Sequence, residues 1–188
     1  MSGDFTARPT ALPGCYELNL PRSHDARGSF TKIVHAETFR RLGLTADFTE
    51  VFCTESRRGV IRGLHFQTPP HDHAKLVVCL RGRVQDAAVD LRRGSPTYRQ
   101  NVTIELDAER DNALYIPTGL AHGFCTLSET ATLLYFTTTP HAPTHDSGIA
   151  WDSAGIRWAT DAPTLSARDR QHPALADFDS PFDYLSAT

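Results

Sequence analysis

An arginine and a histidine interrupt a run that otherwise alternates like a β-strand, RGVIRGLHFQTPP at positions 58–70. Arg62 is suited to bind an anion such as a phosphate, and His65 can exchange a proton near neutral pH. A lone histidine in a strand is more often structural than catalytic. Here, however, three further polar side chains fall in strand-like runs of their own: Lys75, His122 and Tyr135. Several polar groups inside one β body require mutual pairing or a ligand.

These residue types indicate a specific chemistry. An arginine and a lysine together favour the binding of a diphosphate or of a developing oxyanion. A histidine beside a tyrosine supplies one base and one acid, which is the minimum for moving a proton off and onto carbon. On these residues alone, a cluster of mutually paired side chains and an acid–base enzyme with an anionic ligand both remain open.

A second pattern concerns metal binding. His71-x-His73 and the later segment PTGLAH, which ends at His122, resemble the two halves of the cupin motif and hence a small jelly-roll barrel. In metal-binding cupins a carboxylate follows the histidine pair by four or five residues, and Val77 and Val78 stand at those positions. Three imidazoles would suffice for Zn or Fe. The incomplete ligand set instead favours a solvated turn for His71 and His73, and we predict neither a metal nor another cofactor.

The elements that must position these residues are short strands separated by turn residues, in the runs GVIRGLHF, AKLVVCLRG, VQDAAVDLRRGSPTY, RQNVTIEL, NALYIP, LAHGFCTL and TATLLYFTTT. Strands at this spacing are typical of an all-β sandwich or barrel. We predict a single all-β domain over residues 1–188, a cupin jelly-roll barrel with short peripheral helices. One helix is expected at 36–44, with Phe39, Leu42 and Leu44 facing the core. The tail from Asp161 is expected to be irregular cover, with a short helix in TLSARDR.

Composition limits the function classes. The 188 residues carry a net charge of −3, which argues against a nucleic-acid partner held by bulk charge. We find no 18-residue apolar run and no signal-peptide pattern at the start, so we predict no membrane partner and a cytoplasmic location. The four cysteines form no Cys-x-x-Cys pair and are expected to be reduced, buried thiols.

The segments RGVIRGLHFQTPP, AKLVVCLRGRVQDAAVDLRRGSPTY, YIPTGLAHGF, LSETATLLYFTTT and HDSGIAW resemble the dTDP-4-dehydrorhamnose 3,5-epimerase family. DARGSF near the start and LSARDR near the end extend the resemblance over residues 14–178. It implies a metal-free jelly-roll homodimer that acts on a nucleoside-diphosphate 4-keto-6-deoxy sugar. Such an enzyme inverts C3, C5 or both by removing and returning a proton next to the C4 ketone.

The resemblance also implies roles for individual residues. His65, in RGLHF, matches the base, and Asp169 matches the carboxylate that holds its imidazole. Tyr135 matches the acid, and Lys75 matches the cation at the C4 oxyanion, with Asp86 expected to pair with it. The remaining matches are substrate contacts: Arg62 and His122 for the diphosphate and sugar, and Arg27 for the nucleotide at the dimer interface.

Departures from the family pattern fall near the expected nucleoside. Lys32 replaces a glutamate, and Glu50 and Phe52 stand in a segment that is Gln-x-Asn in the family. His141 replaces a tyrosine that stacks on thymine, and two milder changes are Arg168 for lysine and Asp146 for glutamate. A histidine offers less stacking area than a tyrosine. We therefore predict an intact proton-transfer set with altered nucleotide handling, so that TDP, UDP, CDP and GDP remain open.

Three other functions fit parts of the pattern. A keto-isomerase on the same fold would use the same base but move the carbonyl between C3 and C4. A metal-dependent cupin enzyme would use the three-histidine set, and a sugar-binding cupin would need no base at all. The fold alone does not separate these functions.

Overall fold

The computed structural model describes residues 5–184. Its elements are β1 (Thr6–Pro9), β2 (Tyr16–Asn19), β3 (Arg22–Asp25), β4 (Gly28–Thr31), α1 (Ala36–Arg41), β5 (Glu50–Arg57), β6 (Ile61–Gln67), β7 (Lys75–Arg81), β8 (Arg83–Asp90), β9 (Asn101–Asp107), β10 (Asn112–Ile116), β11 (Leu120–Thr126), β12 (Thr130–Thr137), β13 (Asp146–Gly148) and the 3-10 turn η1 (Leu175–Asp177).

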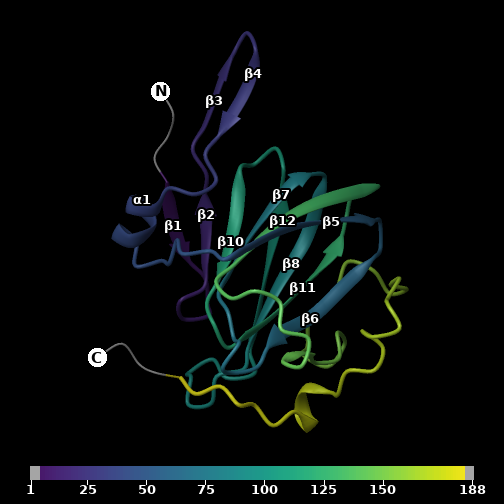
Figure 1. Ribbon diagram of the computed structural model, residues 1–188. Helices are drawn as coiled ribbons and strands as arrows, with labels where there is room; N and C mark the ends of the chain where they lie inside the picture. The colour runs from purple at the N-terminus through teal and green to yellow at the C-terminus, as the bar shows by residue number, and fades with distance from the viewer. Residues whose placement is uncertain (1–4, 185–188) are drawn as a thin grey trace.

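Within the described residues, the main strands form two antiparallel sheets. One has the order β1-β2-β10-β7-β12-β5 and the other the order β13-β6-β11-β8-β9. Neighbours in each sheet are rarely neighbours in sequence, as expected when a chain wraps back and forth between two layers. The small hairpin β3-β4 projects away from both sheets (Figure 1). This arrangement is the cupin-like jelly roll that the sequence predicts.

The main core lies between the two sheets. It takes side chains from both layers, such as Val77 and Leu133 from one sheet and Val84 and Phe124 from the other. All four are at most 2% exposed. Each fully buried side chain of this size contributes about 1.5–3 kcal/mol, so this layer holds the two sheets together.

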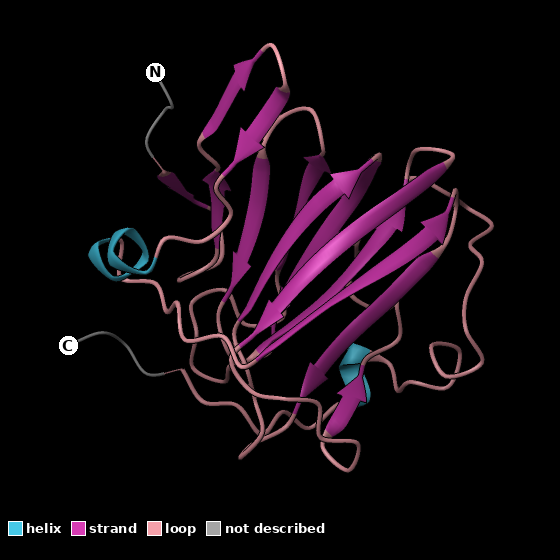
Figure 2. Cartoon of the chain, turned by 45° about the horizontal axis from the view of Figure 1, so that its top comes forward, coloured by secondary structure: helices cyan, strands magenta, loops and turns pink. Residues whose placement is uncertain are grey.

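Both outer faces are covered as well, which explains why strands such as β10 and β11 are buried at every position. Phe39 of α1 packs with Leu76 and Tyr115 on the outside of the first sheet. On the second sheet, Leu175 and Phe182 of the C-terminal tail pack over Leu64. Figure 2 shows the strands lying side by side, with the helical pieces at the periphery.

The predicted helix at 36–44 is confirmed, although it ends at Arg41. Gly43 follows with a φ of 74°, a conformation that glycine adopts readily after a helix. Phe39 and Leu44 are buried, while Leu42 is only half-buried. Within residues 5–184, no helix is long and apolar enough to cross a membrane.

Two predictions about the periphery are wrong. The segment TLSARDR forms no helix but a turn, pinned where Thr164 pairs with Val60 of the strand region. Ser166 Oγ accepts the backbone N–H of Asp169 at 3.0 Å and closes this turn. Cys53, expected to be buried, is exposed because it lies on the edge strand β5; all four cysteines are free thiols.

Candidate active site

A cavity of about 290 Å³ opens between the two sheets. Its walls come from β5, β6, β7, β11, β12 and the tail turn, and its polar lining consists of Thr54, Arg62, His65, Lys75, His122, Tyr135, Ser166, Arg168 and Asp169. The sequence-predicted catalytic set therefore meets in one place. Each member stands on a strand or turn whose own packing fixes its direction.

A β-bulge explains how Arg62 and His65 both reach this cavity. Three positions apart, they would point to opposite faces of a regular strand. The pairing of β6 with β11 shifts by one residue here, because His65 lies opposite His122 but Arg62 lies opposite Phe124. The extra residue reverses the alternation. Gly63 permits it: a Cβ there would lie 2.6 Å from the backbone of Gly123.

His65 and Asp169 form the expected pair, although 104 residues separate them in the chain. His65 Nε2 lies 2.6 Å from Asp169 Oδ1, and the aspartate is 3% exposed. Burial alone would raise the pKa of Asp169, but the hydrogen bond and charge of His65 outweigh it and lower the pKa below its ordinary value. An ionised Asp169 makes Nε2 the donor. The lone pair of the neutral ring is therefore on Nδ1.

Tyr135 stands on the opposite sheet. Its ring stacks on Phe52 with the centroids 4.7 Å apart, and its hydroxyl lies 3.5 Å from Thr54 Oγ1. Burial raises the pKa of Tyr135 above its ordinary value, so the phenol keeps its proton at neutral pH. His65 is on β6 and Tyr135 is on β12, so the imidazole and the phenol line the same cavity from different sheets.

Lys75 lies between these two groups. Its Nζ donates to the carbonyl oxygen of His65 at 3.3 Å. Burial lowers the pKa of Lys75 to about 8, although the charges of Asp146 and Asp86 act in the opposite direction. The expected ion pair of Lys75 with Asp86 is wrong. Asp86 instead accepts from His122 Nε2, at 2.9 Å to both oxygens, because the two side chains are diagonal neighbours on β8 and β11.

The groove continues past Lys75 into an adjoining cavity of about 230 Å³. The second cavity shares Phe52, His65, Lys75 and Arg168 with the first and adds a lining that includes Glu50, Gln67, His73, Thr137, His141 and Asp146. Arg168 Nη2 donates to Asp146 Oδ1 at 2.7 Å, and Glu50 Oε2 accepts the N–H of His141 at 2.6 Å. All the residues that depart from the family pattern except Lys32 thus gather at this end.

Arg27 and Lys32 do not reach this groove. Arg27 is at the tip of the β3-β4 hairpin, where it pairs with Asp25, and Lys32 directly follows the hairpin as an exposed residue. A separate shallow hollow lies at the hairpin, lined by Arg27 and its neighbours. The structure of one chain therefore brings all but two of the predicted site residues together.

The three histidines considered for a metal do not converge. Among residues 5–184, the one group of ligand atoms within 4.8 Å of one another is His65, Asp169 and His172. His73 is held by Gln67, whose Nε2 lies 3.2 Å from its Nδ1. Burial lowers the pKa of His73 to about 3, so its ring stays neutral. The residue is half-buried, which differs from the solvated turn that the sequence predicted.

Sequence reasoning missed Gln67, which lines the second cavity, and His172, which lies outside both cavities. Gln67, 3% exposed, bonds to the carbonyls of His71 and Pro140 and accepts the N–H of Ala142, and so fixes two loops beside the second cavity. The one sequence signal that could have indicated Gln67 is a glutamine at the end of a largely apolar strand run. His172, three residues after Asp169, gave no signal.

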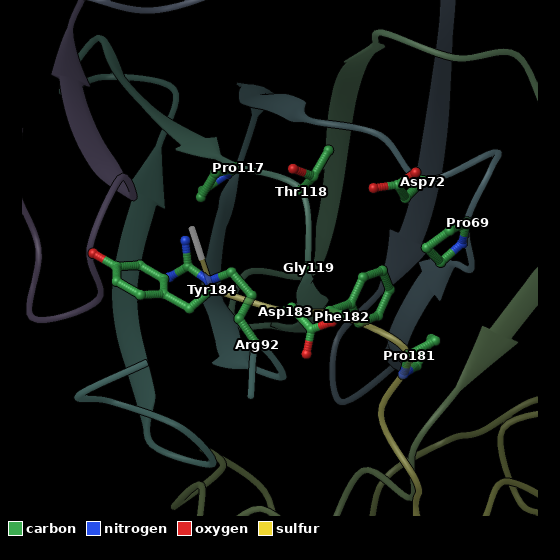
Figure 3. A pocket seen from close by; sticks show the side chains of 10 residues that line it. All are labelled: Pro69, Asp72, Arg92, Pro117, Thr118, Gly119, Pro181, Phe182, Asp183 and Tyr184. Atoms are coloured by element: carbon green, nitrogen blue, oxygen red, sulfur yellow. The ribbon is translucent and has the colours of Figure 1, made fainter. Parts of the chain in front are cut away.

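A further cavity of about 240 Å³ lies at another place, where the end of β10 and the tail meet (Figure 3). Arg92 and Tyr184 line it, and the guanidinium carbon lies 5.0 Å from the ring centroid. The charge of Arg92 is already neutralised by the buried Asp90, with two contacts of 2.9 Å. By contrast, Arg62 and Lys75 have no carboxylate partner within the described residues. Unlike this further cavity, the groove therefore holds two cations that are free to bind an anion.

The jelly-roll barrel, and a cavity that holds a His–Asp pair and a phenol, fit the isomerase class of enzymes. The family model described as dTDP-4-dehydrorhamnose 3,5-epimerase matches residues 9–177. The chain belongs to this family, as its motifs predict.

Individual relatives support the same family. A dTDP-4-dehydrorhamnose 3,5-epimerase of Salmonella typhimurium is 41% identical over 170 residues, which cover 88% of this chain and 93% of the relative. A dTDP-4-dehydrorhamnose 3-epimerase of Streptomyces niveus is 36% identical, and the match covers 90% of this chain and 84% of the relative. The crystal structure of a Legionella pneumophila epimerase in complex with dTDP-4-keto-L-rhamnose superposes with a TM-score of 0.92 at 31% identity. The match covers 97% of this chain and 100% of that chain.

Proposed function

We propose that this epimerase inverts C3, C5 or both of a nucleoside-diphosphate 4-keto-6-deoxyhexose, with His65 as the base and Tyr135 as the acid. The observation that carries the proposal is the placement of the His65–Asp169 pair and the Tyr135 phenol on facing sheets of one cavity. Inversion at carbon requires a proton to leave one face and to return to the other, and this arrangement offers one group at each face.

The reaction follows from these groups. The C4 ketone acidifies the hydrogens on C3 and C5, and Nδ1 of His65 takes one of them, leaving an enolate. Asp169 stabilises the imidazolium that forms, and Lys75 stabilises the negative charge on the C4 oxygen. Tyr135 then donates its proton to the other face, and proton exchange through solvent resets both groups.

The substrate end of the proposal rests on the groove and on the relatives. A groove of two joined cavities suits a sugar and a diphosphate followed by a nucleoside, and the Legionella relative is described with a dTDP-linked keto sugar. We propose Arg62 and His122 as contacts to the sugar and diphosphate. Glu50, Phe52, His141, Asp146 and Arg168 are proposed to surround the nucleoside.

His65→Ala tests the base. General-base catalysis typically contributes about 10²–10⁴ in rate, so the variant is expected to lose at least a hundredfold in turnover. NMR in deuterium oxide identifies the carbon that exchanges and the product that forms. Exchange at C3 alone, at C5 alone or at both defines the reaction. Turnover within a few-fold of wild type would contradict the assignment, and a 3-keto product would identify a keto-isomerase instead.

Calorimetry with TDP, UDP, CDP and GDP tests the nucleotide. The altered side chains around the second cavity predict weaker TDP binding than in typical family members, by about 1–3 kcal/mol for each base contact left unpaired. Tight binding of TDP with clear selectivity over the other three would show that these residues make new contacts with thymine.

We further propose that the protein is a homodimer and that Arg27 and Lys32 act on the partner's nucleotide. Phe30 on the same hairpin is 64% exposed, and the edge strand β5 exposes Val51 at 54% and Phe52 at 40%, so a partner chain at these places would cover apolar side chains. Analytical ultracentrifugation tests the oligomer, with a monomer at micromolar concentration as the contrary result.

Two predictions about the chain as a whole also remain proposals. The four free thiols support a reducing compartment, in line with the predicted cytoplasmic location. The shared core between the sheets supports one domain over 1–188, of which residues 5–184 are described.

A further inference from the structure

His172 lies directly behind the His65–Asp169 pair. Its Nε2 is buried, has no hydrogen-bond partner in the described residues, and lies 3.9 Å from Asp169 Oδ1. The rings of His65 and His172 meet edge to face with centroids 5.5 Å apart. Gly148 makes room for this ring, since a Cβ there would lie 2.6 Å from His172 Nε2. A buried nitrogen without a partner requires an explanation.

The three side chains present the ligand set of a zinc site. One ligand atom from each of His65, Asp169 and His172 lies within 4.8 Å of the other two. Zinc binds imidazole nitrogen and carboxylate oxygen at about 2.0–2.2 Å, so tetrahedral ligands are about 3.4 Å apart. The observed distances of 2.6 Å and 3.9 Å to Asp169 Oδ1 lie on either side of that value. Small side-chain rotations would therefore seat the ion.

We propose that His65, Asp169 and His172 form a zinc-binding site, and that bound zinc reversibly inhibits the epimerase. The site has three protein ligands and leaves a fourth position for water. The binding half of this inference stands on the ligand geometry alone, whereas the inhibition half rests on the proposed function of His65.

Inhibition follows from the tautomer of His65. In the active form the proton is on Nε2, facing Asp169, and the lone pair on Nδ1 is free to accept the substrate proton. Zinc binds through the lone pair of Nε2, so the ring proton moves to Nδ1. The ring then has no lone pair for the substrate. Because the metal binds on the Asp169 side of the ring, zinc is expected to lower kcat with little change in KM.

The test uses zinc chloride with purified full-length protein. Calorimetry is expected to show one zinc per chain. Cobalt(II), which substitutes for zinc, is expected to give the intense visible absorption of a four-coordinate site. EDTA is expected to restore the activity that zinc removes. His172→Ala is expected to weaken zinc binding and zinc inhibition at least tenfold while metal-free activity stays within threefold of wild type. His172→Gln serves the same purpose if the alanine variant does not fold.

Two matched controls separate this site from other zinc-binding groups. His145→Ala removes one histidine of another pair of neighbouring imidazoles, His71 and His145, whose ring centroids are 4.5 Å apart. Cys53→Ser removes the exposed thiol. Both variants are expected to remain as sensitive to zinc as the wild type. Absence of the cobalt spectrum, or equal zinc sensitivity of the His172 variants and wild type, would overturn the site. A cobalt spectrum that depends on His172 without loss of activity would overturn the inhibition and the role of His65.

Discussion

Replacing Asp169 by asparagine removes the charge beside His65, the proposed base. The side chain keeps its size and remains able to occupy the turn that Ser166 holds. What changes is the partner of His65 Nε2, from a buried carboxylate oxygen at 2.6 Å to a neutral amide.

The size of the effect follows from that contact. A hydrogen bond to a charged group contributes about 1.5–3 kcal/mol, so loss of the charge alone costs roughly 10- to 150-fold in rate. An amide N–H that turns toward Nε2 would also favour the wrong tautomer, an effect that reaches about 10⁴ in a hydrolase with a comparable His–Asp pair. We therefore expect Asp169→Asn to lower kcat by about 10²–10⁴ with little change in KM.

Steady-state turnover and solvent deuterium uptake measure this loss. Both should fall together, because the base acts before either outcome. Asp179→Asn, at an exposed acid of the same tail, is the matched control and should behave as the wild type. A kcat for Asp169→Asn within threefold of wild type, at an unchanged melting temperature, would refute the account of the His–Asp pair.

Tyr135→Phe should still take up solvent deuterium but form little inverted product, since the proposed base His65 removes the proton without it. The control Tyr115→Phe, outside the groove, should leave both deuterium uptake and inversion unchanged. Equal loss of exchange and inversion would make Tyr135 a positioning group. Turnover should decline above a pH of about 8 as Lys75 loses its proton, and a flat profile to pH 9.5 would show that its charge is not needed. Burial would raise the pKa of Asp90, but hydrogen bonds, chiefly from Arg92, lower it below its ordinary 3.8. The ionised carboxylate therefore stabilises the fold above pH 3.8, and this contribution is lost as the pH falls through the lowered pKa of the folded protein. Asp90→Asn should lower the melting temperature at pH 7 and flatten its acid dependence, whereas a parallel pH profile would contradict this.

The sequence predicts β6 to β12 well because burial in or against the two sheets makes their segments short and largely apolar. It misses β1 to β5 and β13. Of these, β3 is almost wholly exposed and polar, and the edge position of β5 leaves several apolar side chains in solvent. Neither strand has the pattern that a buried face imposes.

At the site, residue types were predictable but contacts were not. Asp86 and His122 pair because the register of β8 and β11 brings them together, and register is not visible in one sequence. The helix predicted for TLSARDR had the right composition, yet pairing of Thr164 with Val60 outweighs local propensity. Gly63 inside a strand was the visible sign of the bulge that aims Arg62 and His65.

The tail that covers the second sheet has a consequence for how the enzyme fails. Asp169 reaches His65 only while this irregular segment stays docked through apolar contacts such as Leu175 and Phe182. Segments without regular hydrogen-bond ladders open at a lower free energy than the sheets they cover. Mild heating or dilute urea should therefore detach the tail, and silence the enzyme, before the barrel loses its circular dichroism signal. Activity would then report on peripheral docking, and spectroscopy on the barrel, as two separate transitions.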